Sequence, residues 1–152
     1  MKKIKRIMAA IDFSIYSKSV LEHALALAEK TNAEILAVNV INKRDSEAVK
    51  KAFNAEHPGE FSERIYRQNE INRRKEKFKT LAGQCVPENT DLPIVFREGV
   101  PFQEILKAVE EEKADFLIFG HKGRTDNRGF SFGTAAEKIF RHCPVPVMSL
   151  RE

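Results

Sequence analysis

The sequence predicts an α/β fold, a five-stranded parallel sheet with helices on both faces in an open Rossmann-like sandwich. Short apolar runs of strand length recur along the chain, and stretches with helical spacing of apolar residues separate them. Helices between consecutive strands require crossover connections, which are right-handed almost without exception, so the strands should lie parallel. The length of 152 residues suits a single domain, which we expect to span residues 1–152.

The first strand is expected within residues 4–11, where the continuous apolar run 7–11 is typical of a strand covered on both faces. A helix should follow, in which Ser14 or Ser17 can cap the free N–H groups at its start. The apolar run 35–41 predicts the second strand. The buried stripe of the helix consists of apolar residues at three- and four-residue spacing: Val20, Leu21, Ala24, Leu25 and Ala28.

Residues 42–85 give a weaker pattern. The stretch 42–59 is polar and contains the breaker His57-Pro58-Gly59, so we expect a loop with one helical turn or more around residues 47–54. From Phe61 to Cys85, the spacing of apolar residues predicts a long helix with a strongly basic outer face.

Three strands and two helices complete the predicted order of five strands alternating with four helices. The strands are expected at 92–96, at 116–119 ending at Gly120, and at 145–150. Pro101 is well placed in the first turn of the helix between the first two of these strands. The stripes of the two helices are Phe102, Ile105, Leu106 and Val109, and then Ala136, Ile139, Phe140 and Cys143 before Pro144.

The net charge of +4 is unevenly distributed, because residues 42–80 hold eleven basic and seven acidic side chains. A nucleic-acid or acidic-partner surface on the long helix is one interpretation. Acidic residues are interleaved and no aromatic stacking platform accompanies the cations, so we expect a solvated face instead. The cations concerned are Arg64, Arg67, Arg73, Arg74, Lys75, Lys77 and Lys79.

Composition also bears on location. No apolar run approaches the roughly 18–20 residues of a membrane-spanning helix, so no membrane partner is expected. Only about five apolar residues separate the basic start from Asp12, too few for a signal peptide. Cys85 and Cys143 form neither a disulfide framework nor a C-x-x-C pair. We therefore expect a protein of the reduced cytoplasm.

A ligand site is expected beyond the carboxyl ends of the strands, where the strand order reverses. At the end of the fourth strand the sequence reads Gly120-His121-Lys122-Gly123, and nine residues later Gly133-Thr134 precede a helix. Glycines let a ligand approach the backbone closely, and the N–H groups at a helix start bind phosphate.

Lys122, Arg124 and Arg128 lie between Gly120 and Gly133 and can offset the charge of a triphosphate. The alternative is that the glycines form a turn and Thr134 merely caps a helix, since isolated glycine patterns are weak evidence. The combination favours a phosphate site, because the glycines fall at the end of a strand and at the start of the next helix, where the topology places a ligand.

The sequence resembles the universal stress proteins, whose ATP-binding members carry G-x2-G-x9-G-[ST] at the fourth strand and the next helix. Gly120, Gly123 and Gly133-Thr134 match every fixed position and both spacings. Further resemblance lies in Ile11-Asp12-Phe13-Ser14, in Gly99-Val100-Pro101 and in residues 136–147. The likeness covers nearly the whole chain and implies an adenine-nucleotide alpha hydrolase-like fold.

The resemblance also implies a site for ATP with Mg²⁺. It places Asp12 beside the ribose and the phosphate or metal region, the backbone of Val40 at the adenine edge, and Gly120 at the ribose. It also implies that Gly123, Gly133 and Thr134 hold the phosphates. Asp12 has the alternative role of capping the first helix, and both roles are compatible because the cap faces the same crevice. The expected ATP-binding residues are Asp12, Val40, Gly120, Lys122, Gly123, Arg124, Gly133 and Thr134.

Two departures from the family pattern concern the width of the pocket. His121-Lys122 stand where many members have a small or hydroxyl residue, and Phe13 is bulkier than the residue usual before Ser14.

The expected function is that of a nucleotide-dependent regulatory or stress-response switch with, at most, weak ATP hydrolysis. No H-x-x-H spacing, G-x-S-x-G elbow or Walker lysine motif occurs, so a zinc site, a serine hydrolase and a P-loop ATPase are not indicated. The resemblance implies a homodimer through Val145, Val147 and Leu150 of the last strand. Two alternatives stay open: a slow ATPase or phosphotransferase in which Asp12 positions the metal, and a stress protein that binds a protein partner without ATP.

Overall fold

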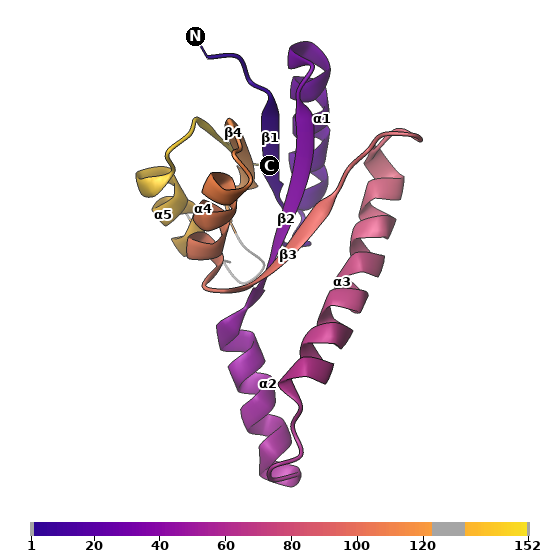
Figure 1. Ribbon diagram of the computed structural model, residues 1–152, viewed down its shortest axis with the longest axis vertical. Helices are drawn as coiled ribbons and strands as arrows, with labels where there is room; N and C mark the ends of the chain where they lie inside the picture. Colours follow the sequence, from indigo (N-terminus) through magenta and orange to yellow (C-terminus); the bar gives the residue numbers. More distant parts are fainter. Residues whose placement is uncertain (1, 123–132, 152) are drawn as a thin grey trace.

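A five-stranded sheet in which every paired neighbour is parallel forms the centre of the molecule, as predicted. The computed structural model describes residues 2–122 and 133–151. The strand order is β3-β2-β1-β4-β5 (Figure 1). The elements are β1 (Arg6–Ala10), α1 (Ser17–Thr31), β2 (Glu34–Asn42), α2 (Lys43–Glu56), α3 (Glu63–Cys85), β3 (Ile94–Gly99), α4 (Pro101–Glu111), β4 (Phe116–Gly120), α5 (Thr134–His142) and β5 (Val147–Leu150).

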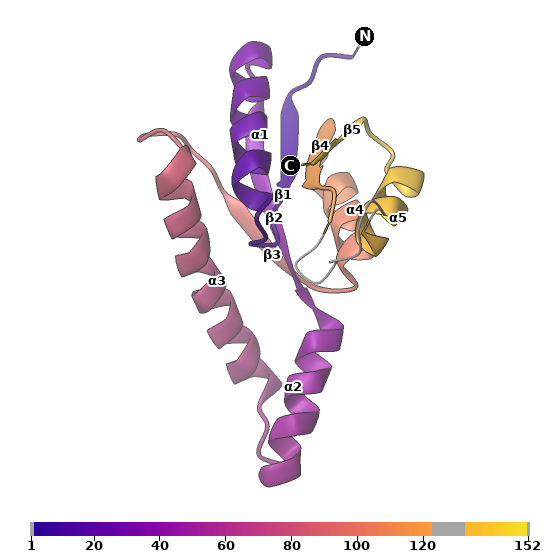
Figure 2. The same cartoon turned by 180° about the vertical axis from the view of Figure 1, so that it is seen from behind.

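Helices cover both faces of the sheet. The helices α1 and α3 pack on one face, and α4 and α5 pack on the other (Figures 1 and 2). Alternation along the strands supplies both cores: Ala9 and Ala37 face α1 and α3, whereas Met8 and Val38 face α4. Strands buried on both faces explain the continuous apolar runs in the sequence.

The strand order reverses at the centre of the sheet. From β1 the chain builds outward through β2 to β3, then returns to place β4 on the other side of β1. Consequently the carboxyl ends of β1 and β4 lie side by side while their connections leave in opposite directions, which is the usual position of a ligand crevice.

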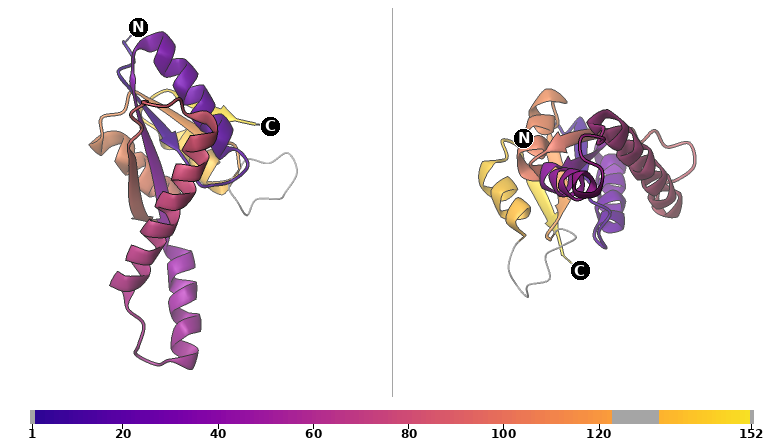
Figure 3. Two further views of the ribbon diagram at one scale, coloured as in Figure 1. Left: turned by 90° about the vertical axis from the view of Figure 1, so that its right-hand side faces the viewer. Right: turned by 90° about the horizontal axis from the view of Figure 1, so that it is seen from below.

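The helix α2 corrects the sequence-based expectation of a loop at residues 42–59. It is a 14-residue helix, and the Asn42 side chain caps it by accepting a hydrogen bond from the Arg44 N–H at 3.0 Å. None of its residues is buried, and its two large apolar residues, Val49 and Phe53, are exposed, so the sequence signal for this helix is weak. With α3 it forms a hairpin that projects beyond the carboxyl ends of the strands and elongates the molecule (Figure 3).

The edge strand β3 is displaced toward the C-terminus of its expected position at 92–96. Pro93 lacks an N–H group, although its carbonyl still accepts from the N–H of Ala37 at 2.9 Å. Arg97 and Glu98 continue the strand at the sheet edge, where polar side chains reach water.

Within the described ranges, no helix is both long and apolar enough to cross a membrane.

Candidate functional site

Asp12 follows β1 and organises the turn that leads into α1. Its Oδ1 accepts hydrogen bonds from the N–H of Ser14 at 2.9 Å and from the hydroxyl of Ser17 at 3.2 Å. The Ser14 hydroxyl in turn accepts from the N–H of Tyr16 at 3.3 Å. The expectation that Asp12, Ser14 or Ser17 caps α1 is wrong, because the N-cap residue is Tyr16 and no side chain caps the helix. Asp12 instead stabilises the turn before α1, and its carboxylate lies at the end of β1 beside β4.

Phe13 adopts a left-handed backbone conformation, with φ of 61°, which is uncommon for a bulky residue. Its ring packs against the core beneath α1 and α3, and Lys77 Nζ lies 5.8 Å from the ring centroid. The bulky Phe13 side chain, which we expected to affect the width of the nucleotide pocket, thus faces α3. It lines a groove of about 650 Å³ together with Ser14 and Ser17.

Val40 presents its backbone polar groups beyond the end of β1. Alternate residues of a parallel strand direct their N–H and C=O groups to opposite neighbours. The Val38 carbonyl accepts from the N–H of Ile11 at 2.9 Å, so Val40, two residues later, also faces the β1 side. Because β1 ends at Ala10, the polar groups of Val40 face the space where the chain turns at Asp12.

A buried polar network lies beside Val40 and was missed by the sequence analysis. Asn39 is 1% exposed and donates from Nδ2 to the Ile11 carbonyl at 2.7 Å. Its Oδ1 accepts from Nη1 of Arg74 at 2.9 Å. The same Nη1 lies 3.5 Å from the carbonyl oxygen of Val40, and Arg74 Nε donates to Glu70 at 3.2 Å. The network ties α3 to the ends of β1 and β2.

Arg74 therefore corrects the expectation that the cations of the long helix are all solvated, since it is 4% exposed. A hydrogen bond from Arg73 lowers the pKa of Glu70, to which Arg74 also donates. The sequence feature that could have indicated a buried partner is Asn39, a polar residue inside the otherwise apolar run 35–41. A buried amide requires partners, and a cation from the neighbouring helix can supply one.

Gly120 ends β4 directly beneath Tyr16. A Cβ added at Gly120 would lie 2.8 Å from the Cβ of Tyr16, closer than side chains normally approach. The close packing of α1 on β4 is thus one structural reason for this glycine, alongside its expected place at a ribose.

Replacing Gly120 with alanine should destabilise the fold by about 1–3 kcal/mol, because Tyr16 and the start of α1 must move to relieve the overlap. Thermal unfolding followed by circular dichroism measures the effect. Gly83→Ala is the control: nothing lies within 4 Å of its added Cβ, and alanine in the helix interior should stabilise by about 0.5–1 kcal/mol. Equal melting temperatures for Gly120→Ala and the parent would contradict the packing argument.

Gly133 joins the end of β4 to the start of α5. Its N–H donates to the His121 carbonyl at 3.1 Å, and its own carbonyl accepts from the N–H of Glu137 at 3.0 Å. The N–H of His121 meanwhile donates to the Leu150 carbonyl at 2.7 Å. The buried Gly133 is the N-cap residue of α5 and has no side chain to cap the helix, whereas Thr134 is exposed. The first N–H groups of α5 therefore lie next to the end of β4, an arrangement that suits an anion.

The structure thus brings Asp12, Gly120 and Gly133 to the same end of the sheet, through strand pairing and the Gly133–His121 hydrogen bond. Val40 lies there as well, on the far side of β1, and the half-buried Lys122 follows β4. Of the remaining predicted residues, Gly123, Arg124 and Arg128 lie outside the described part of the chain.

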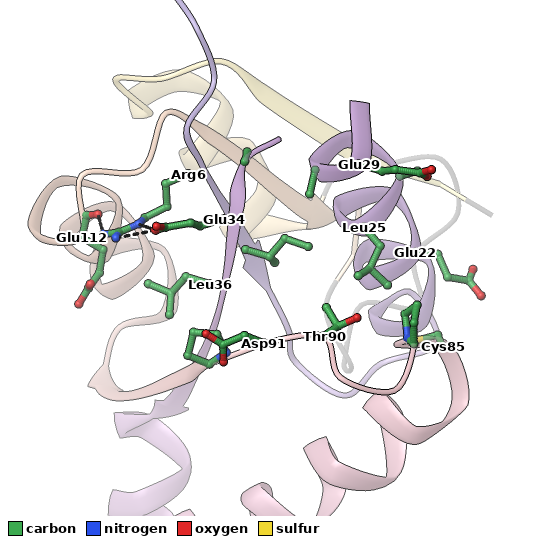
Figure 4. A pocket seen from close by; sticks show the side chains of 16 residues that line it. Arg6, Glu22, Leu25, Glu29, Glu34, Leu36, Cys85, Thr90, Asp91 and Glu112 are labelled. Carbon is green, nitrogen blue, oxygen red and sulfur yellow. Dashed lines mark hydrogen bonds and ion pairs between the residues drawn. The ribbon is translucent and has the colours of Figure 1, made fainter. Parts of the chain in front are cut away.

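A groove of about 900 Å³ lies at the opposite, amino-terminal end of the strands (Figure 4). Arg6 points across its wall and donates to Glu34 at 2.8 Å and to the Glu112 carbonyl at 2.6 Å, so its guanidinium is already engaged. Cys85 also lines this groove, and burial raises the pKa of its thiol. Of the predicted ATP-binding residues that the structure describes, none lines this groove or the one between α1 and α3.

Comparison with known families gives a match along almost the whole chain. The model of the universal stress protein family matches residues 3–151. Universal stress protein MJ0531 of Methanocaldococcus jannaschii is 27% identical over 146 residues, which cover 95% of this chain and 81% of the relative. A universal stress protein of Methanothermobacter thermautotrophicus is 29% identical over 138 residues, covering 90% and 88% of the two chains.

Solved structures show the same fold. The chain of MJ0577, a protein whose biochemical function was assigned from its structure, superimposes with a TM-score of 0.77 at 22% identity and covers 98% of that chain and 99% of this one. A universal stress protein in complex with cAMP superimposes with a TM-score of 0.65 at 17% identity, covering 98% of that chain and 99% of this one.

Proposed function

Because the chain belongs to the universal stress protein family, we propose that it binds ATP at the carboxyl ends of β1, β2 and β4 and acts as a nucleotide-dependent regulatory or stress-response switch. A family relative in complex with cAMP supports an adenine nucleotide as the ligand class. The expected location is the cytoplasm.

The observation that supports the proposal is the position of Gly120 and Gly133. Gly120 ends β4 and Gly133 is the N-cap of α5, and the hydrogen bond from Gly133 to His121 brings them to one end of the sheet. Gly133 has φ of −60°, which any residue can adopt, so its backbone conformation does not require glycine. In the proposed site, glycine is needed at this position because a side chain would occupy the space in which a phosphate contacts the first N–H groups of α5.

The remaining residues complete a nucleotide site in this arrangement. The N–H and C=O of Val40 match the edge of an adenine, which offers an acceptor nitrogen and an amino donor. Gly120, at the end of β4, is the residue expected beside the ribose. The Thr134 hydroxyl and the Lys122 ammonium add donors for the phosphates, with Gly123 and Arg124 from the segment between them.

The residues present fit a magnesium ion accompanying the phosphates. Mg²⁺ prefers oxygen ligands and is usually held by one or two carboxylates together with phosphate oxygens and water. Asp12 offers one carboxylate at the end of β1, where Ser14 and Ser17 hold its Oδ1 and fix its orientation. The ion would supply charge neutralisation at the phosphates.

A switch needs only that ATP binds one conformation of the protein better than another, because a ligand shifts an equilibrium by its differential affinity. The Gly133–His121 hydrogen bond joins the phosphate side of the site to β4, and Asn39 and Arg74 join the base side to α3. Occupancy can therefore be transmitted to helices on both faces of the sheet.

The presence of nucleotide in the purified protein tests the proposal. The protein is purified without added nucleotide and denatured, and the released small molecules are identified by absorbance and mass spectrometry. ATP or another adenine nucleotide in an amount approaching one per chain is the expected result. If the denatured sample releases none, and the chain also takes up no added ATP, the proposed function is wrong.

We also propose that two copies pair through β5. This strand is at the sheet edge and bonds to β4 on one side. The carbonyls of Pro146 and Leu150 face β4, accepting from Leu117 and His121. Val147, of opposite parity, therefore directs its N–H and C=O outward, where a second copy can add its own strand about a twofold axis.

Val147→Pro should convert the dimer to a monomer, because proline removes an outward N–H without affecting the ladder with β4. Proline is tolerated at the first residue of an edge strand, so the fold should be retained. Light scattering at micromolar concentration measures the mass. The control Val147→Thr keeps the N–H and should remain dimeric; a parent protein that is already monomeric would refute the pairing.

A further inference from the structure

The buried guanidinium of Arg74 lies against the one carbonyl that the proposed function assigns to the base of the nucleotide. Arg74 Nη1 is 3.5 Å from the Val40 oxygen and 2.9 Å from Asn39 Oδ1. Only 5% of the Arg74 side chain is exposed, so it reaches a ligand mainly through these two groups.

A backbone N–H and C=O pair that makes no other hydrogen bond binds adenine in preference to a 6-oxo purine. The carbonyl accepts from the 6-amino group of adenine, and the N–H donates to its ring nitrogen. Hypoxanthine, the base of inosine, has a carbonyl at position 6 and an N–H in the ring, so both contacts become unfavourable. Discrimination of this kind is large when the opposing polar groups are left unpaired.

The guanidinium of Arg74 weakens this preference for adenine at Val40. An N–H donor beside the carbonyl competes with the amino group of adenine for the oxygen, and its positive charge favours an acceptor on the base. Arginine is the side chain that commonly recognises the 6-oxo group of guanine. The cation is fixed in place by Glu70 at 3.2 Å and by Asn39, whose other end is anchored on the Ile11 carbonyl.

We propose that Arg74 determines the base selectivity of the site, by weakening the preference of Val40 for a 6-amino purine so that 6-oxo purine nucleotides are accepted as well. The inference rests on the proposed nucleotide site at the ends of β1, β2 and β4. Arg74 is thus a specificity-determining residue that acts through the Val40 carbonyl.

Calorimetric titration of the whole protein with ATP and with inosine triphosphate tests the inference, because the two ligands differ only at the base edge. For the parent, we expect the two Kd values to agree within about tenfold; Arg74→Met should widen the preference for ATP by about a further tenfold. Arg74→Lys keeps the charge and should retain much of the parent ratio. Arg73→Met, an exposed cation that also binds Glu70, should leave the ratio unchanged.

Arg74→Leu, which removes both the N–H donors and the charge, serves as a second neutral variant if the methionine variant does not fold. A parent that already prefers ATP by more than about a hundredfold would overturn the inference without any variant. An unchanged ratio in a folded neutral variant would overturn it as well, while ATP binding itself stays intact. Failure of the parent to bind either nucleotide would instead remove the proposed function, and this inference with it.

Discussion

Gly133→Val is expected to weaken ATP binding by about a hundredfold, equivalent to about 2.7 kcal/mol. The valine side chain would stand at the N-cap of α5, in the space through which a phosphate reaches the first N–H groups of the helix. The backbone angles of Gly133, φ −60° and ψ 148°, are accessible to valine. The measurement is a calorimetric or fluorescence titration with ATP and magnesium, accompanied by a melting curve.

Thr134→Val is the matched control for this change. Thr134 is exposed on the first turn of α5, and valine has nearly the same shape without the hydroxyl. Loss of one hydrogen bond to phosphate should lower the affinity by about tenfold, less than the steric block at Gly133. If both variants bind ATP like the parent, phosphates do not lie at the start of α5.

Asn39→Leu is expected to cost about 3–5 kcal/mol of folding stability. Leucine preserves the approximate volume but removes the side-chain partner of the Ile11 carbonyl and leaves Arg74 Nη1 only its 3.5 Å contact with the Val40 oxygen, in a region where Asn39 is 1% exposed. Removing a partner from a buried cation costs more than an ordinary surface hydrogen bond. Chemical denaturation with urea gives the free energy of unfolding.

Asn72→Leu provides the comparison, since Asn72 is an exposed asparagine on α3 that accepts only a surface hydrogen bond from Gln68 at 3.1 Å. The free energy of unfolding of the Asn72→Leu protein should stay within about 0.5 kcal/mol of that of the parent. An Asn39→Leu protein as stable as the Asn72→Leu protein would mean that the buried network contributes nothing to the fold.

The fold could be predicted because the signals that define it are local. Strands covered on both faces form continuous apolar runs, as at 7–11 and 35–41, and alternation with helices leaves a parallel sheet as the simple solution. The helix α2 could not be predicted in this way, because it buries no residue. Its cap at Asn42 is a local signal, but a single capping residue does not distinguish a helix from a turn.

The candidate site was predictable where a short motif falls at an element boundary, as at Gly120 and Gly133. The buried network was not, since Asn39 and Arg74 are 35 residues apart and meet only because α3 packs over the end of β2. A sequence shows that Arg74 is one of several cations in a basic helix. Which of them faces inward depends on how the helix is rotated against the sheet.

Mapping by NMR of the backbone amides that respond to ATP shows directly where on this sheet the nucleotide binds. ¹⁵N-labelled protein is titrated with ATP and magnesium, and chemical-shift changes are followed for each assigned amide. We expect saturable changes that concentrate at Asp12, Val40, Gly120 and Gly133. Changes that concentrate instead around Glu34 and the groove at the opposite end of the sheet, or no saturable change at millimolar ATP, would contradict the proposed nucleotide site.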